Sequence, residues 1–256
     1  MKFLRRTLTA ATALAAACFA IQAQASVVIA STRVIYPAQE REVTIKLSND
    51  GRTPALVQAW LDDGNITDLP ETLNVPFVLT PAIFRMDPGK GQTLRLIHTK
   101  EAMARDKESL YWLNVLEVPP KPQAGEGAVN RLQIAFRTRI KVMYRPQGLP
   151  GQVDEAPAQL RWELLPAGGG KGYVLKASNP TAYVVNLGKV SLQSGGQAYD
   201  AAAGYVLPGE SALFPIAGMV SAPGAGVQVR FNSINDWGAN VEGSLPLTPA
   251  PASATR

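Results

Sequence analysis

Hydrophobic and polar positions alternate in short runs along most of this chain. Runs such as EVTIKLSND at 42–50 and QTLRLIHT at 92–99 place apolar residues at every second position and end close to turn-forming residues. This period of two is typical of half-buried β-strands bounded by turns. Seven such segments before residue 147 predict a sandwich of two antiparallel sheets, with one short helical turn at 100–108.

The pattern is interrupted once and then resumes. The segment RPQGLPGQVDEAPAQ at 145–159 lacks apolar periodicity and predicts a hinge between two domains. A second series of strands begins with LRWELL at 160–165 and ends with ANVEGSLPL at 239–247. We therefore expect an all-β fold with domains at 26–147 and 148–247. The Pro- and Ala-rich tail at 248–256 is expected to be disordered.

One segment, RLQIAFRTRIKVMYRP at 131–146, alternates over about three times the usual strand length of roughly 5–6 residues. Its first half carries the apolar residues Leu132, Ile134 and Phe136, and its second half carries the cations Arg137, Arg139, Lys141 and Arg145. A buried strand does not tolerate this charge, and an exposed edge strand avoids this much apolar surface. The pattern leaves open whether the apolar residues fill the protein's own core or contact another molecule.

Residues 1–25 have the pattern of a secretory signal peptide. The cations Lys2, Arg5 and Arg6 precede an apolar run, and Ala23-Gln24-Ala25 forms a cleavage motif, so we predict a cut after Ala25. The one cysteine of the sequence lies in this leader. The mature chain is therefore expected to contain no disulfide, no thiol nucleophile and no cysteine-ligated zinc.

The charge balance gives no indication of a nucleic-acid partner. The full sequence has 25 Lys and Arg against 20 Asp and Glu, but three of these cations belong to the predicted leader. Without them, 22 cations face 20 carboxylates, so the mature chain is nearly neutral. We expect an exported protein that neither binds nucleic acid nor inserts into a membrane.

The sequence gives no indication of catalysis. The single histidine, His98, lies on an alternating segment and is expected to be structural. The chain has no phosphate-binding or HExxH motif. Gly168 to Gly170 lie between two predicted strands and indicate a hairpin loop, and Asp62-Asp63 lies at a turn. We therefore expect no enzymatic activity, no metal site and no cofactor.

Four motifs resemble those of the periplasmic pilus chaperones of the chaperone–usher pathway. They are MARDKESLYWLNVLEVP at 103–119, IKVMYRP at 140–146, SNPT at 178–181 and INDWG at 234–238. The resemblance implies two immunoglobulin-like β-sandwich domains in a boomerang arrangement. It also implies a chaperone that binds, folds and caps fimbrial subunits by strand donation, a form of β-strand addition, and delivers them to an outer-membrane usher.

The resemblance assigns three sets of site residues. It implies that Arg33 and Lys141 anchor the C-terminal carboxylate of the subunit, and that Leu132, Ile134 and Phe136 are the donated residues. It also implies that Arg95, Glu108 and Asp236 form an inter-domain salt-bridge network. No role is assigned to Arg137, Arg139 and Arg145, which are expected to lie on a solvated face.

The alternatives are a secreted two-domain adhesin or carbohydrate-binding sandwich, and a hydrolase that depends on His98. An adhesin would carry clustered aromatic residues in loops, whereas most of the four tryptophans lie in strand patterns. The short segment between Pro119 and Arg131 resembles the short-loop subclass of the chaperones. An exposed apolar edge also leaves open a dimer in which two copies cap each other. The sequence does not name the subunit or the usher.

Overall fold

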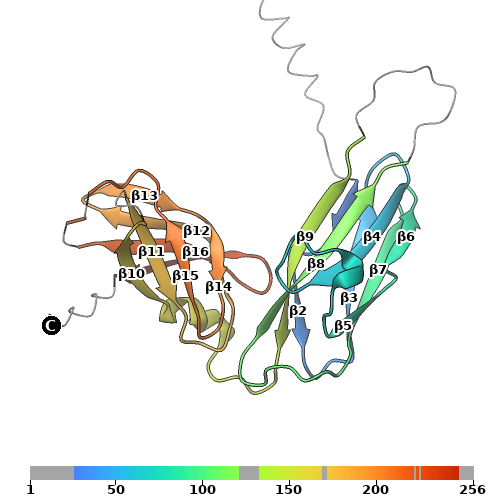
Figure 1. Cartoon of the computed structure of the whole chain (residues 1–256), viewed down its shortest axis with the longest axis horizontal. Coiled ribbons are helices and arrows are strands. Elements are labelled where there is room, and N and C mark those ends of the chain that lie inside the picture. The colour runs from blue at the N-terminus through green and yellow to red at the C-terminus, as the bar shows by residue number, and fades with distance from the viewer. Residues whose placement is uncertain (1–25, 121–132, 169–171, 222, 225, 248–256) are drawn as a thin grey trace, which may run out of the picture.

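The computed structural model describes residues 26–120, 133–168, 172–221, 223–224 and 226–247. These residues form two β-sandwich lobes set at an angle and joined by a short connection after β9 (Figure 1). The all-β prediction with two sandwich domains is therefore confirmed. The predicted leader, the C-terminal tail and the segment 121–132 lie outside the described residues. No helix in the described part of the chain is long and apolar enough to cross a membrane.

The first lobe packs two sheets against each other. One sheet has the order β1-β3-β7-β5 and the other β2-β9-β8-β4-β6. The strands are β1 (Val27–Ile29), β2 (Arg33–Pro37), β3 (Glu42–Asn49), β4 (Ala55–Asp62), β5 (Phe77–Thr80), β6 (Ile83–Met86), β7 (Gly91–His98), β8 (Ser109–Val118) and β9 (Phe136–Arg145). The period-two pattern sets their faces: in β3, Ile45 and Leu47 are buried while Thr44 and Lys46 are exposed.

Two segments that we predicted as single strands are divided between the sheets. The run 26–37 forms β1 in one sheet and β2 in the other, and the run 77–89 divides in the same way into β5 and β6. The hydrophobic alternation does not reveal such a crossing, because each half keeps the same period. The first crossing brings β2 alongside β9 in a parallel pair, with Arg33 opposite Lys141.

The second lobe is a separate sandwich with its own core. Its sheets have the orders β10-β11-β15 and β13-β12-β16-β17, with β14 paired to β12. The strands are β10 (Arg161–Pro166), β11 (Tyr173–Ser178), β12 (Val185–Ser194), β13 (Gln197–Ala201), β14 (Gly204–Val206), β15 (Ser211–Pro215), β16 (Gln228–Ile234) and β17 (Asn240–Pro246). At its centre, the fully buried Trp162 packs against Phe214 and Phe231.

The helical content differs from the prediction. Residues 100–108 form no helix, and the helices within the described residues are the short 3₁₀ turns η1 (Pro70–Thr72) and η2 (Val153–Gln159). The second turn lies within the predicted hinge, where Ala156 is buried in the core of the second lobe. Leu149 and Val153 also pack against this core, so much of the segment is a packed part of the second domain. Irregularly spaced apolar contacts within a Pro-rich run give no periodicity, so the pattern did not reveal this packing.

Candidate functional site

The N-terminal half of β9 has an open edge. On one side, β8 pairs with β9 from Phe136 to Tyr144, and on the other side β2 pairs only with Lys141–Arg145. Among the described residues, positions 136–140 therefore have a ladder partner on one side only. Such an edge presents free backbone donors and acceptors to an additional strand.

Apolar side chains lead up to this open edge. Ile134 is 50% exposed and Phe136 is 41% exposed, so neither is packed in the core of its own domain. The strand begins at Phe136, and Gln133–Ala135 are irregular, which makes β9 shorter than predicted. Leu132 lies outside the described residues. Exposed side chains of this size cost free energy in water, so their position indicates a surface that another molecule covers.

Two cations lie at the point where the open edge ends. Arg33 and Lys141 are directly opposite each other on β2 and β9, on the face that meets the second lobe. Arg33 donates from Nη1 to the carbonyl of Ile234 at 3.0 Å, and its buried Nε has no hydrogen-bond partner among the described residues. Lys141 donates from Nζ to Oδ1 of Asn186 at 2.6 Å. Both cations thus lie partly buried between the lobes.

The positive charge of the pair is only partly offset by neighbouring carboxylates. Among the described residues, no carboxylate lies within salt-bridge distance of Arg33 or Lys141. Burial and the nearby charge of Arg33 lower the pKa of Lys141 to about 8. Burial also lowers the pKa of Arg33, although Asp236 partly offsets this. A bound carboxylate would relieve both effects, since it can accept charge-assisted hydrogen bonds from both cations.

The lowered pKa predicts a pH-dependent affinity for carboxylates. A bound carboxylate favours charged Lys141 and raises its pKa, so binding above about pH 8 takes up a proton. The affinity of a peptide with a free C-terminal carboxylate is expected to be constant between about pH 5 and pH 7, where both the carboxylate and Lys141 are charged. It should fall by up to about tenfold per unit as the pH rises above about 8. Calorimetric titration checks this. Lys141→Arg should abolish the decline, and an unchanged decline in that variant would contradict the assignment.

A second group of charges joins the two lobes. Arg145, at the end of β9, donates from Nε to Glu108 and from its two terminal nitrogens to Asp236 at 2.6 and 2.9 Å. The other carboxylate oxygen of Glu108 accepts from the backbone N–H of Val184 at 2.7 Å. Burial disfavours the charge on Arg145, but the bonds to the carboxylates outweigh burial and hold its pKa above the ordinary value.

The placement of Arg95 in this inter-domain network was wrong. Arg95 lies on β7, where it pairs with Glu42 of β3 inside the first lobe, and its side chain is exposed. Arg145 occupies the predicted position between Glu108 and Asp236 instead. The sequence carried a usable signal: Arg145 lies four residues after Lys141, so on a strand both side chains point to the same face.

Arg137 and Arg139 are also not simply solvated. Arg139 forms an ion pair with the fully buried Asp62, and its guanidinium lies 4.1 Å from the ring centre of Trp112. Arg137 lies 4.9 Å from the ring centre of Trp60. Burial raises the pKa of Asp62, but hydrogen bonds from Arg139 and Asn114 outweigh this and lower it. These cations therefore stiffen the face of the first lobe that carries Lys141.

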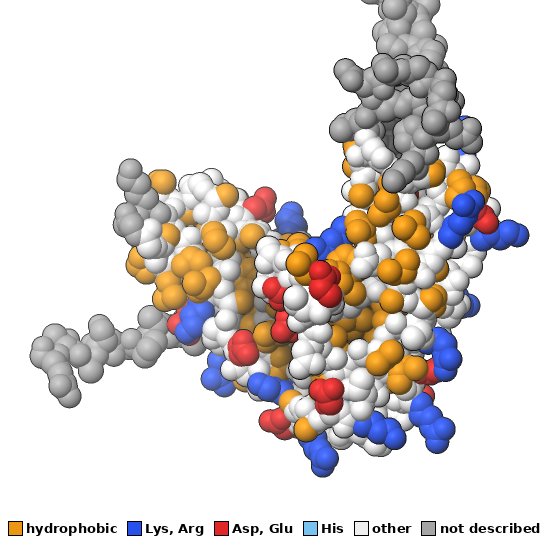
Figure 2. All heavy atoms as spheres, turned by 45° about the vertical axis from the view of Figure 1, so that its right-hand side comes forward, with side chains coloured by type: hydrophobic (Ala, Val, Ile, Leu, Met, Phe, Trp, Pro, Cys, Tyr) orange, Lys and Arg blue, Asp and Glu red, His pale blue; other side chains and the backbone are white. Residues whose placement is uncertain are grey.

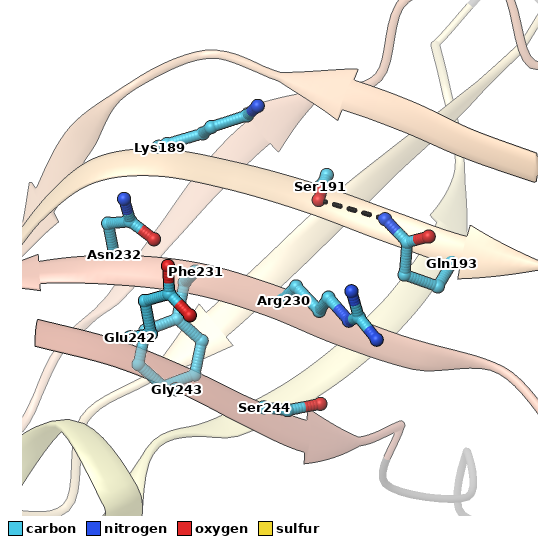
Figure 3. Close-up of a pocket in the computed structure, with 9 residues that line it drawn as sticks. All are labelled: Lys189, Ser191, Gln193, Arg230, Phe231, Asn232, Glu242, Gly243 and Ser244. Carbon is cyan, nitrogen blue, oxygen red and sulfur yellow. Dashed lines mark hydrogen bonds between the residues drawn. The ribbon is translucent and has the colours of Figure 1, made fainter.

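Other candidate sites contribute little. His98 packs among aromatic rings, with its centroid 5.0 Å from that of Tyr144. No group of metal-ligating side chains was found among the described residues. A hollow of about 530 Å³ lies on the outer face of β12, β16 and β17. Figure 3 shows the residues that line it, among which Gln193 donates to Ser191 at 3.2 Å. It is lined mostly by polar side chains and contains none of the predicted site residues.

An open strand edge, exposed apolar side chains and a cation pair between two sandwiches define a two-domain protein built to bind another chain. The first lobe matches the model of the pili and flagellar-assembly chaperone PapD N-terminal domain over residues 26–150. The second matches the model of the pili assembly chaperone PapD C-terminal domain over residues 155–245. The chain therefore belongs to the pili assembly chaperone family, whose members are chaperones and not enzymes.

Individual relatives cover most of the chain. The probable fimbrial chaperone YadV of Escherichia coli K12 is 40% identical over 90% of this chain and 93% of its own length. The chaperone protein FimB/FhaD of Bordetella pertussis is 48% identical over 68% of this chain and 70% of its own length. The crystal structure of the Pseudomonas aeruginosa CupB2 chaperone superposes with a TM-score of 0.72 at 37% identity. The superposition covers 86% of this chain and 100% of the CupB2 chain.

Proposed function

We propose that this chain captures fimbrial subunits by adding its own β9 to their incomplete sandwiches. The observation that supports this is the open edge of β9, which begins at exposed Phe136 and ends at Arg33 and Lys141. A subunit strand that pairs with this edge covers free backbone groups. At the same time, Leu132, Ile134 and Phe136 enter its unfilled core.

The cation pair fixes the register of the added strand. The subunit runs parallel to β9, as β2 does, and its C-terminal carboxylate binds Arg33 and Lys141. Charge-assisted bonds of this kind contribute roughly 1.5–3 kcal/mol each. A strand that slips by one residue turns its side chains to the wrong face, so the anchor decides which subunit pockets receive Ile134 and Phe136.

A related complex supports the choice of partner. The Salmonella enterica SafB chaperone, solved in complex with the SafA pilin, superposes on this chain with a TM-score of 0.70 at 27% identity. It covers 88% of this chain and 97% of that one. We propose the same kind of partner, a pilus subunit, for the present chain.

We also propose that the chain is exported and that it delivers its subunits to an usher. Residues 1–25 direct the chain to the periplasm and are removed after Ala25, and the mature protein consists of the domains at 26–147 and 148–247. There it delivers each subunit to an outer-membrane usher, without enzymatic turnover. The inter-domain bonds of Arg145 keep the second lobe beside the anchor throughout.

Co-purification tests the proposal. The tagged full chain is expressed together with the fimbrial subunits of its own cell. It is expected to be purified from the periplasm as an equimolar complex with one subunit. Ile134→Asp combined with Phe136→Asp should remove the subunit and leave folding intact, because both side chains are exposed. Val78→Asp, at a position exposed to a similar degree on β5, serves as the matched control. A glycan-binding chain without any bound subunit would instead favour an adhesin.

A further inference from the structure

Trp237 is an exposed tryptophan beside the anchor. It lies in the loop Asn235–Ala239 between β16 and β17, and the residue is 92% exposed. Tryptophan is usually well buried on average, and it is enriched at the centres of binding interfaces. The exposure of Trp237 therefore indicates a surface that a binding partner contacts.

The loop holds Trp237 in place. Oδ1 of Asn235 accepts hydrogen bonds from the N–H groups of Trp237 and Ala239, at 3.1 and 2.9 Å. The neighbouring Asp236 is bound by Arg145. Gly238 has a φ of +84° and lies so close to Thr32 that an added Cβ would lie 2.7 Å from its hydroxyl oxygen. A loop fixed from three sides loses little conformational entropy when a ligand binds to it.

A cavity connects Trp237 to Arg33 of the cation pair. It has a volume of about 610 Å³ and opens where the chain crosses from β1 to β2, and its lining includes Ile35, Arg33 and Trp237. This volume is within the range of pockets that hold small ligands, roughly 300–1,000 Å³. Figure 2 shows hydrophobic and charged side chains close together around the hollow between the lobes. Apolar groups, Arg33 and Asp236 thus share one cavity at the start of β2, and the charge of Asp236 is paired with Arg145.

We propose that this cavity receives a bulky apolar or aromatic side chain from the last residues of the bound subunit, with Trp237 as its contact surface. The inference rests on the proposed function, because it takes the strand on the edge of β9 to end at Arg33. The charge of Arg33 selects the terminal carboxylate, and Trp237 and Ile35 select the side chain beside it. Trp237 is thus a specificity-determining residue that prefers some subunit termini to others.

Short synthetic peptides test the carboxylate anchor and the role of Trp237 separately. Four peptides share one alternating sequence and differ in the last residue, Phe or Ala, and in the terminus, free acid or amide. Calorimetry with the mature protein is expected to show the Phe-ended acid binding about tenfold tighter than the Ala-ended acid. Trp237→Ala should abolish this preference. Trp237→Phe should retain part of the preference. Val220→Ser, at a similarly exposed site, should retain all of it.

The outcomes distinguish the inference from the function on which it rests. A wild-type protein that binds both acids equally, or a Trp237→Ala variant that keeps the preference, overturns the role of Trp237. A protein that binds acids and amides equally overturns the carboxylate anchor. Failure to bind any of the four peptides overturns the proposed function, and with it this inference.

Discussion

Arg33→Glu and Lys141→Glu variants are each expected to lose at least about a hundredfold in affinity for a fimbrial subunit. Each change removes charge-assisted bonds to the subunit carboxylate and places a like charge against it. The loss of one such bond, roughly 1.5–3 kcal/mol, already exceeds tenfold, and the repulsion adds to it. Quantitative pull-down of the subunit and calorimetry with its C-terminal peptide measure the effect.

Two further variants show that the effect belongs to the site. Lys46→Glu changes the charge on the outer face of β3 and should leave capture unchanged, since Lys46 is exposed and lies in the other sheet of the sandwich from Arg33 and Lys141. Lys141→Met should abolish capture but stabilise the free protein by about 1 kcal/mol, because it removes a partly buried cation that faces Arg33. Capture at wild-type level by either charge-reversal variant would contradict the anchor.

Arg145→Ala is expected to destabilise the protein by about 3–5 kcal/mol. Glu108 has a fully buried side chain, and burial already raises its pKa against the opposing effect of Arg145. Removing Arg145 leaves this carboxylate without its cation in a site that excludes water, which is the costly way to break a buried pair. Asp236 loses the same partner, so the contact between the lobes also weakens.

Arg95→Ala is the matched control for this prediction. Its ion pair with Glu42 is exposed and screened by solvent, so its loss should hardly change stability. Chemical denaturation measures both variants, and small-angle X-ray scattering measures whether the angle between the lobes becomes variable in Arg145→Ala. Equal stability losses in the two variants would show that Arg145 does not have the structural role assigned to it.

The sequence predicted the architecture because period-two alternation records which face of each strand is buried. It did not predict where the chain changes sheets, as it does between Ile29 and Arg33, because the alternation continues on both sides of the crossing. That crossing matters for the site, since it brings Arg33 beside Lys141 and leaves the earlier part of β9 open.

Short motifs pointed to Glu108 and Asp236, whereas contacts that join distant segments were not predicted. Arg95 and Arg145 have the same chemistry, and only the three-dimensional register shows which of them meets Glu108 and Asp236. Arg139 was expected to be solvated because its partner Asp62 is 77 residues away in the sequence. Trp237 lies in the INDWG motif at 234–238, but its exposure follows from the loop conformation and not from the residue type.

Hydrogen exchange on the open edge tests the central claim most directly. In the free protein, the part of β9 from Phe136 to Ile140 has a ladder partner on one side only among the described residues. When a fimbrial subunit binds, backbone amides in this segment should become protected, and the protection should be lost in the Lys141→Glu variant. Unchanged exchange in this segment, with protection confined to the second lobe, would contradict strand addition to β9.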